Sequence, residues 1–192
     1  MIRLIAILFI LLPLGSFAAP ISYALQADRS EVGFVYTLSG ANNRGSMPVR
    51  SANIVIDLQQ FANSSADVTL DVSQARTGLI FATEALKAAS VLDARGHPTI
   101  RFQSTAVRAN NPRNLSEGGQ IDGLLTIKGV TRPVTLNAAV FRQRGAPEGD
   151  LSQLSFRISG AVKRSDFGAS GYSDIVADTI NIDIAARVIA AP

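Results

Sequence analysis

Residues 123–136 read GLLTIKGVTRPVTL, two runs of alternating aliphatic residues separated by a glycine at position 129. Successive side chains of a β-strand point to opposite faces, so each run predicts a strand with one apolar and one polar face. A glycine between two such runs is typical of a tight hairpin turn. The stretch therefore predicts an antiparallel β-hairpin, whose apolar face must cover something.

The position of the turn decides which residues of this hairpin lie opposite each other. A type II′ turn takes glycine as the first of its two central residues, which fits Gly129-Val130. Ile127 then lies opposite Arg132. A turn at Lys128-Gly129 would shift the partners but keep the faces. In both cases one face carries Ile121, Leu125, Ile127, Val134, Leu136 and Val140.

The same alternation recurs along the rest of the chain. The segments with this pattern are residues 32–39, 54–58, 68–73, 100–103, 154–163 and 180–188. A row of about eight amphipathic strands without intervening helices predicts an all-β antiparallel domain, either a closed barrel or a sandwich.

One segment departs from the strand pattern. Residues 83–92, TEALKAASVL, are rich in helix formers; Thr83 suits the N-cap and Glu84 the positive end of a helix. The sequence RGHP at residues 95–98 is expected to end this helix. We therefore predict one short helix.

The N-terminus has the pattern of a secretory signal. Arg3 precedes an apolar run at residues 4–14, and small residues at positions 16 and 18 fit cleavage after Ala18. We expect residues 1–18 to be a signal peptide and residues 19–192 to form a single domain exported to the periplasm. Because the chain has no cysteine, we expect neither disulfides nor thiol chemistry.

Composition argues against several classes of function. Charged residues make up 17% of the chain, the formal net charge is +3, and like charges form no long run, so a nucleic-acid-binding surface is not expected. His97 is the single histidine, which is too few for a zinc site and a weak basis for a Ser-His-Asp site. We therefore expect no metal, no cofactor and no catalysis.

The apolar strand faces can build a solid core or line a cavity. The chain has no Trp, and its inward positions hold mainly Ile, Val, Leu and Ala. A small barrel is either filled by its own side chains or holds one small ligand. A barrel with an empty apolar interior can bind an apolar ligand there. Composition alone leaves both interpretations open.

Four motifs in order resemble the YceI-like family of secreted lipid-binding proteins. They are HPTIRFQS at residues 97–104, GLLTIKGVTRPV at 123–134, RSDFG at 164–168 and DTINI at 178–182. The resemblance extends over residues 22–189. One departure is Arg29, which stands where the family commonly has histidine.

This resemblance implies an eight-stranded, lipocalin-like antiparallel barrel with one short helix and a long tunnel. Family members hold polyisoprenoid chains, isoprenoid quinones and other amphiphiles, which implies an isoprenoid or fatty-acyl lipid as ligand. Strand parity makes ten apolar residues core-facing, and the resemblance favours ligand contact for them; Phe167 and Tyr172 are added from the region of the RSDFG motif. The predicted ligand-contact residues are Phe34, Tyr36, Ile56, Leu70, Phe102, Leu125, Leu136, Phe156, Ile158, Phe167, Tyr172 and Ile182.

Three polar residues are candidates for contact with the head group of that ligand: Arg132, Arg164 and Asp166. Strand parity points Arg132 inward. A buried, unpaired arginine is very costly, so we expect its charged end near a rim, in water or beside a carboxylate. For Arg164 and Asp166 the alternative is a charge-paired turn that closes the barrel, with Phe167 plugging one end.

The sequence thus favours a periplasmic carrier or scavenger of an isoprenoid or other long-chain amphiphile. One alternative is a hydrolase acting on such a lipid, with His97 as the one available imidazole base. Another is a solid barrel without ligand, whose surface binds a partner protein. A homodimer and a transient contact with a membrane are both compatible with the sequence.

Overall fold

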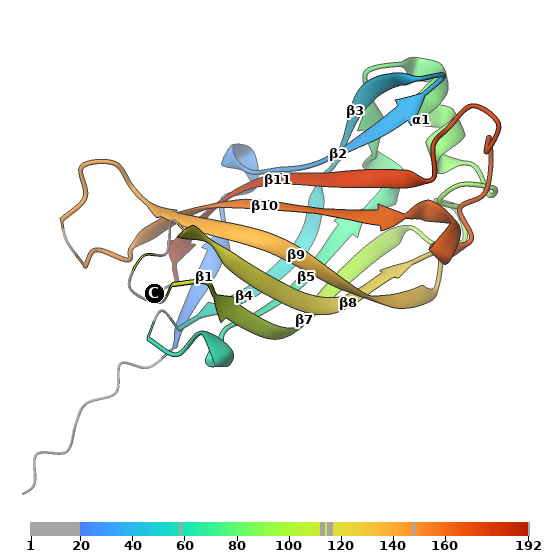
Figure 1. Ribbon diagram of the computed structural model, residues 1–192. Coiled ribbons are helices and arrows are strands. Elements are labelled where there is room, and N and C mark those ends of the chain that lie inside the picture. Colours follow the sequence, from blue (N-terminus) through green and yellow to red (C-terminus); the bar gives the residue numbers. More distant parts are fainter. Residues whose placement is uncertain (1–19, 58, 112–113, 115–116, 148, 192) are drawn as a thin grey trace, which may run out of the picture.

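The computed structural model describes residues 20–57, 59–111, 114, 117–147 and 149–191. The expected signal peptide and its cleavage site lie outside these residues. Figure 1 shows long strands that wrap around a common axis, with the helix α1 at one end. The strands are β1 (Ile21–Leu25), β2 (Glu31–Leu38), β3 (Ala41–Met47), β4 (Val49–Ile56), β5 (Ser65–Asp71), β6 (Arg76–Thr77), β7 (Thr99–Ala109), β8 (Gly119–Ile127), β9 (Val130–Arg142), β10 (Gln153–Lys163) and β11 (Thr179–Ala190); the helix is α1 (Ile80–Lys87).

Eight of the described strands close into a ring. Their order is β1-β4-β5-β7-β8-β9-β10-β11, and β11 pairs back onto β1. All pairings are antiparallel, and the longest joins β10 to β11. The predicted eight-stranded antiparallel barrel with one helix is thereby confirmed. β2, β3 and β6 extend this sheet from the first half of β11, at the end of the barrel where α1 lies (Figure 1).

The hairpin of residues 123–136 forms as β8 and β9, but its first predicted register is wrong. Ile127 pairs with Val130, so the turn is Lys128-Gly129, and Arg132 lies opposite Leu125. Both turn residues have positive φ, 49° and 74°, as a type I′ turn requires. The Lys128 ammonium donates to the carbonyl oxygens of Ala89 and Gly168, which offsets the strain of this backbone at lysine.

The helix begins and ends earlier than predicted. It spans Ile80–Lys87 with Leu79 at the N-cap, so Thr83 lies inside it and not at its start. The Thr83 hydroxyl contacts the Leu79 carbonyl oxygen and receives the backbone N–H of Thr77. The predicted cap therefore ties the helix to β6. Turns, not helix, follow from Ala88 onward.

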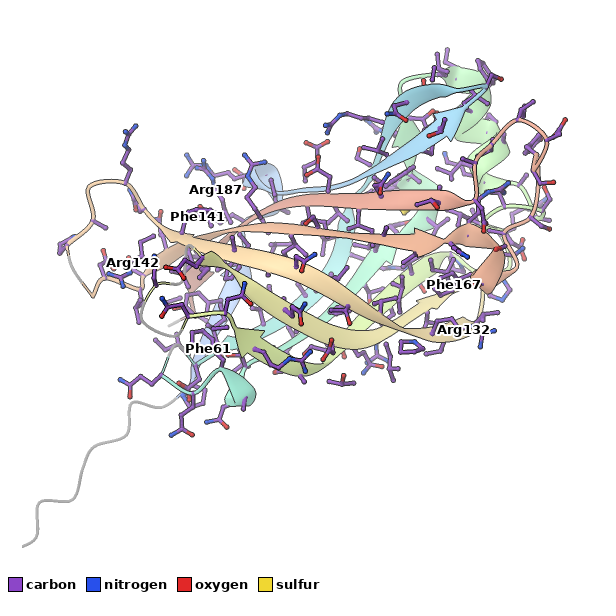
Figure 2. The ribbon with its side chains drawn as sticks, viewed as in Figure 1. Phe61, Arg132, Phe141, Arg142, Phe167 and Arg187 are labelled. Carbon is purple, nitrogen blue, oxygen red and sulfur yellow. The ribbon has the colours of Figure 1, made fainter. Side chains whose placement is uncertain are left out.

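Two buried clusters flank the barrel interior. At one end Tyr23, Ile56, Leu154 and Val188 pack together. At the other end Phe167, in the 3₁₀ turn η5 (Arg164–Phe167), is buried and packs with a second cluster. Figure 2 shows Phe167 at the end opposite to Phe61. The other buried members of the second cluster are Met47, Val72, Ala75, Leu92, Ile100 and Leu125.

Asp57 organises the loop that follows β4. Its carboxylate accepts the backbone N–H groups of Gln59 (2.9 Å) and Gln60 (2.8 Å) and the side-chain amide of Asn63 (3.1 Å). These hydrogen bonds hold the pKa of Asp57 below its ordinary value; the bond from Gln60 has the largest effect and the bond from Asn63 the next largest. The loop is thus stabilised by the charged form of Asp57.

We expect Asp57→Asn to reduce the acid sensitivity of the protein. The folded-state pKa of Asp57 is lower than the unfolded one, so its contribution is complete above a pH of about 4 and is lost as the pH falls through the folded-state pKa. Urea-unfolding midpoints should be measured between neutral and acidic pH. The wild type should lose more stability than Asp57→Asn on acidification, whereas a surface control, Asp28→Asn, should follow the wild type. If the urea-unfolding midpoints of all three proteins change with pH by the same amount, this role of Asp57 is contradicted.

Candidate functional site: an apolar cavity

A single large cavity of about 460 Å³ runs through the interior of the described barrel. Ligand pockets in proteins typically have volumes of about 300–1,000 Å³ and largely apolar walls, so this cavity is large enough for a small lipid. Its lining extends from Phe61 and Ala109 to Phe81 and Tyr172. The barrel is therefore a container, and the interpretation as a solid core is wrong.

The structure places all twelve predicted ligand-contact residues on the cavity wall. They come from eight strands, from η5 and from the segment after it, yet the alternation of strand side chains directs them to one space. That they contact a ligand stays a prediction.

Two glycines allow aromatic rings of this wall to lie against the backbone of the sheet. Phe34 lies opposite Gly45 across β2 and β3, and its ring covers the space that a Cβ of Gly45 would take. A Cβ at Gly123 would lie 2.5 Å from the ring of Phe102. Because each ring rests on a bare backbone, it lines the wall instead of filling the lumen.

The cavity reaches the protein surface beside α1. Phe81, Tyr172 and Ile175 line it and are 64%, 47% and 45% exposed. We call these three residues the mouth. The N–H of Gly171 donates to the carbonyl oxygen of Ser90 (2.8 Å), which holds the segment with Tyr172 and Ile175 against the turns after α1. Sequence reasoning missed Phe81 and Ile175, because neither belongs to an alternating run.

Arg164 lines the cavity but is held by the backbone. It is only 8% exposed, and its guanidinium donates to four carbonyl oxygens in the segment that bears the mouth. The acceptors are Ala169 and Gly171 (2.6 Å each), Val176 (3.1 Å) and Ala177 (3.2 Å). Four of its five N–H donors are thereby used. Arg164 thus builds the rim, and its contact with a head group stays a prediction.

The other two head-group candidates lie outside the cavity. Arg132 shares the inward strand face with Leu125 but is exposed, and its Nε donates to the backbone oxygen of Asp166 (3.2 Å). This agrees with the rim position expected for its charge, and Figure 2 shows Arg132 near Phe167. The Asp166 side chain is also exposed and is not on the cavity wall. The predicted polar cluster is therefore not assembled at the lumen.

His97, the imidazole base of the hydrolase alternative, does not line the cavity. Its Nδ1 lies 3.1 Å from Asp93 Oδ2, in the loop that precedes β7. The N–H of Gly96 and the imidazole of His97 lower the pKa of Asp93. The described residues contain no group of three or more His, Cys, Asp or Glu arranged to hold a metal. Among the helices described, none has the length and apolarity to span a membrane.

Solved structures of other proteins have a similar fold. The Burkholderia cenocepacia protein BcnA superposes with a TM-score of 0.74 at 23% identity, covering 85% of this chain and 99% of BcnA. A polyisoprenoid-binding domain from Saccharophagus degradans, implicated in plant cell wall breakdown, gives a TM-score of 0.64 at 12% identity, covering 89% and 99%. At these identities the likeness shows a shared fold.

Comparison of amino-acid sequences identifies the family of the chain. A UPF0312 protein of Pseudomonas paraeruginosa is 34% identical over 109 residues, which are 55% of this chain and 54% of that protein. Protein YceI of Salmonella arizonae is 34% identical over 110 residues, or 55% and 53%. The chain thus spans about half the length of the curated relatives it matches. The YceI-like domain matches residues 23–188, which is most of the chain. By this match and by its fold, the chain belongs to the YceI-like family.

Proposed function

We propose that this protein is a periplasmic carrier that holds the chain of an isoprenoid or fatty-acyl amphiphile inside its barrel, without chemical change to the ligand. The observation that carries the proposal is the apolar cavity of about 460 Å³, walled by the twelve predicted residues. The similarity of its fold to a polyisoprenoid-binding domain supports a lipid as the guest. The signal-like N-terminus supports export to the periplasm.

The binding energy would come from the hydrocarbon chain. Each buried CH₂ is worth about 0.8 kcal/mol, so a chain of ten or more carbons reaches roughly micromolar affinity after the costs of association. Chain length and width, limited by the lumen, would then decide which lipids fit. Isoprenoid quinones belong to this class because their tails are apolar chains.

Extraction of the purified protein tests the proposal. Solvent extracts should be compared by mass spectrometry with extracts of an equally purified variant whose lumen is narrowed by Ala52→Trp. An amphiphile enriched in the wild type is the expected result. A wild type that yields no lipid, and that binds neither palmitate nor an isoprenoid quinone when these are added, would overturn the carrier function.

The exposed apolar residues at the mouth of the cavity support the idea that the protein takes up its lipid from a membrane surface. Ile80 and Phe81, at the start of α1, are 88% and 64% exposed, and Phe81 belongs to the mouth. Exposed apolar residues that adjoin a lipid-sized cavity are suited to contact the surface from which an amphiphile is taken. A ligand could then enter the lumen without crossing water.

We expect the double variant Ile80→Ser/Phe81→Ser to slow lipid uptake from vesicles about tenfold, because two apolar side chains that would enter the bilayer surface are lost. Transfer of a fluorescent fatty acid from phospholipid vesicles measures this rate. The matched control is Phe141→Ser: Phe141 is 42% exposed, and Figure 2 shows it at the opposite end of the barrel. Equal slowing by both variants would contradict a specific contact through α1.

A further inference from the structure

One polar atom inside the cavity lacks an explanation from packing. Tyr36, on β2, lines the cavity and is only 8% exposed. Its hydroxyl is the one buried side-chain polar atom without a hydrogen-bond partner among the described residues. A buried hydroxyl without a partner is costly, and most such groups in proteins are paired.

Other polar groups of the chain show how unusual this is. Tyr23, also buried at 4% exposed, donates its hydroxyl hydrogen to the carbonyl oxygen of Leu151 (2.9 Å). On the cavity wall, the Thr77 hydroxyl donates to the Leu79 carbonyl oxygen (2.7 Å). Arg164 is held by four carbonyl oxygens, as described above. Tyr36 therefore stands apart from the polar residues around it.

The aromatic ring of Tyr36 does not require the hydroxyl. The ring packs near Phe34, with centroids 6.1 Å apart and planes tilted by 38°. Phenylalanine would make the same contact and would avoid burying an unpaired oxygen. The hydroxyl is thus available to a group that enters the cavity.

We propose that the Tyr36 hydroxyl anchors the bound lipid by donating a hydrogen bond to a carbonyl oxygen of it, of the ester, ketone, carboxyl or quinone type. This rests on the proposed carrier function and narrows its ligand from any hydrocarbon chain to one that bears such an oxygen. A phenol is a good donor, and the surrounding wall is almost wholly apolar, so a single bond there discriminates strongly between ligands with and without the acceptor.

The anchor also fixes the direction of the ligand. Tyr36 precedes Leu38 by two residues, and Leu38 forms a bridge with Val176 beside the mouth. The start of β2 is further inside, where Val32 pairs with Ile184. A lipid held at Tyr36 therefore has its carbonyl group toward the mouth and its tail toward the cluster around Tyr23 and Leu154.

The test uses Tyr36→Phe and two lipids of similar length, methyl palmitate and octadecane, measured by displacement of Nile red from delipidated protein. We expect Tyr36→Phe to weaken binding of methyl palmitate about five- to tenfold, because one hydrogen bond is lost, and to leave octadecane unchanged. An equal effect on both lipids, or no effect on either, would overturn the anchor while leaving the carrier function intact. Failure of the wild type to bind either lipid would overturn both.

Thermal unfolding gives a second readout. Tyr36→Phe should melt at a higher temperature than the wild type when both are free of lipid, because the unpaired hydroxyl is gone. Tyr23→Phe, which removes a hydroxyl that has a partner, should melt at a lower temperature. A lower melting temperature for Tyr36→Phe would show that its hydroxyl supports the fold itself, and would count against the anchor.

Discussion

A tryptophan in place of Ala52 should weaken the binding of palmitate about 30-fold. Ala52 lines the cavity and lies opposite Val68, another residue of the wall, so a large ring at position 52 enters the lumen. A ring that displaces two or three methylene groups of the ligand removes about 2 kcal/mol of burial, which corresponds to this factor. Calorimetric titration with palmitate measures the loss.

The matched control is Asn53→Trp. Asn53 is exposed and pairs with Asp67 on the outer face of the barrel, so the same ring is placed one residue away but outside. The natural chain has no tryptophan, so each variant carries a single fluorophore that reports its own surroundings. The fluorescence emission maximum of Trp at position 52 should be that of an apolar environment, and the maximum of Trp at position 53 should be that of a residue in water. If Ala52→Trp is folded and binds palmitate as tightly as Asn53→Trp does, the ligand is not in the lumen.

Replacing Arg164 by methionine should lower the free energy of unfolding by about 3–4 kcal/mol. The change leaves four carbonyl oxygens of the segment 169–177 without their donor, in a position that is only 8% exposed. For a domain of this size the melting temperature should fall by about 10 °C. Arg164→Lys should recover only part of the loss, because one ammonium cannot reach all four acceptors in the planar arrangement of a guanidinium.

Arg132→Met is the control for this change. Arg132 is exposed and its Nε donates to one backbone oxygen, so its replacement should alter stability by no more than about 0.5 kcal/mol. Urea unfolding of the three variants beside the wild type measures both effects. Arg164 is expected to stabilise the fold, whereas Arg132 is expected to contribute little. Equal losses in the free energy of unfolding for Arg132→Met and Arg164→Met would contradict this distinction.

The barrel and its wall could be predicted because they depend on a local pattern. Strand side chains alternate with a period of two, so residues such as Leu125, Leu136 and Phe156 could be assigned to the inner face before any coordinates were known. β3 escaped prediction for the same reason. Its sequence, ANNRGSM, has no alternation, and it forms because it pairs with β2 and gives the ring of Phe34 a glycine to rest on.

The features that were wrong depend on contacts between distant segments. The turn at Lys128-Gly129 is stabilised by carbonyl oxygens from Ala89 and Gly168, which no local rule could supply. The same holds for Arg164, whose acceptors come from a loop folded back onto it. Its charge suggested contact with a ligand, and only the structure shows that four backbone oxygens also hold it. The orphaned hydroxyl of Tyr36 could likewise be found only in three dimensions.

The central claim is that a lipid chain lies inside the barrel, and contacts between ligand and leucine methyl groups test it most directly. Leu124 and Leu125 are neighbours in β8, but Leu124 is 40% exposed on the outer face, whereas Leu125 is 8% exposed and lines the cavity. In NMR spectra of methyl-labelled protein with palmitate bound, nuclear Overhauser effects from the chain should reach the methyl groups of Leu125 and Leu136 and not those of Leu124. Contacts at Leu124 alone would place the lipid on the outside of the sheet and contradict the account.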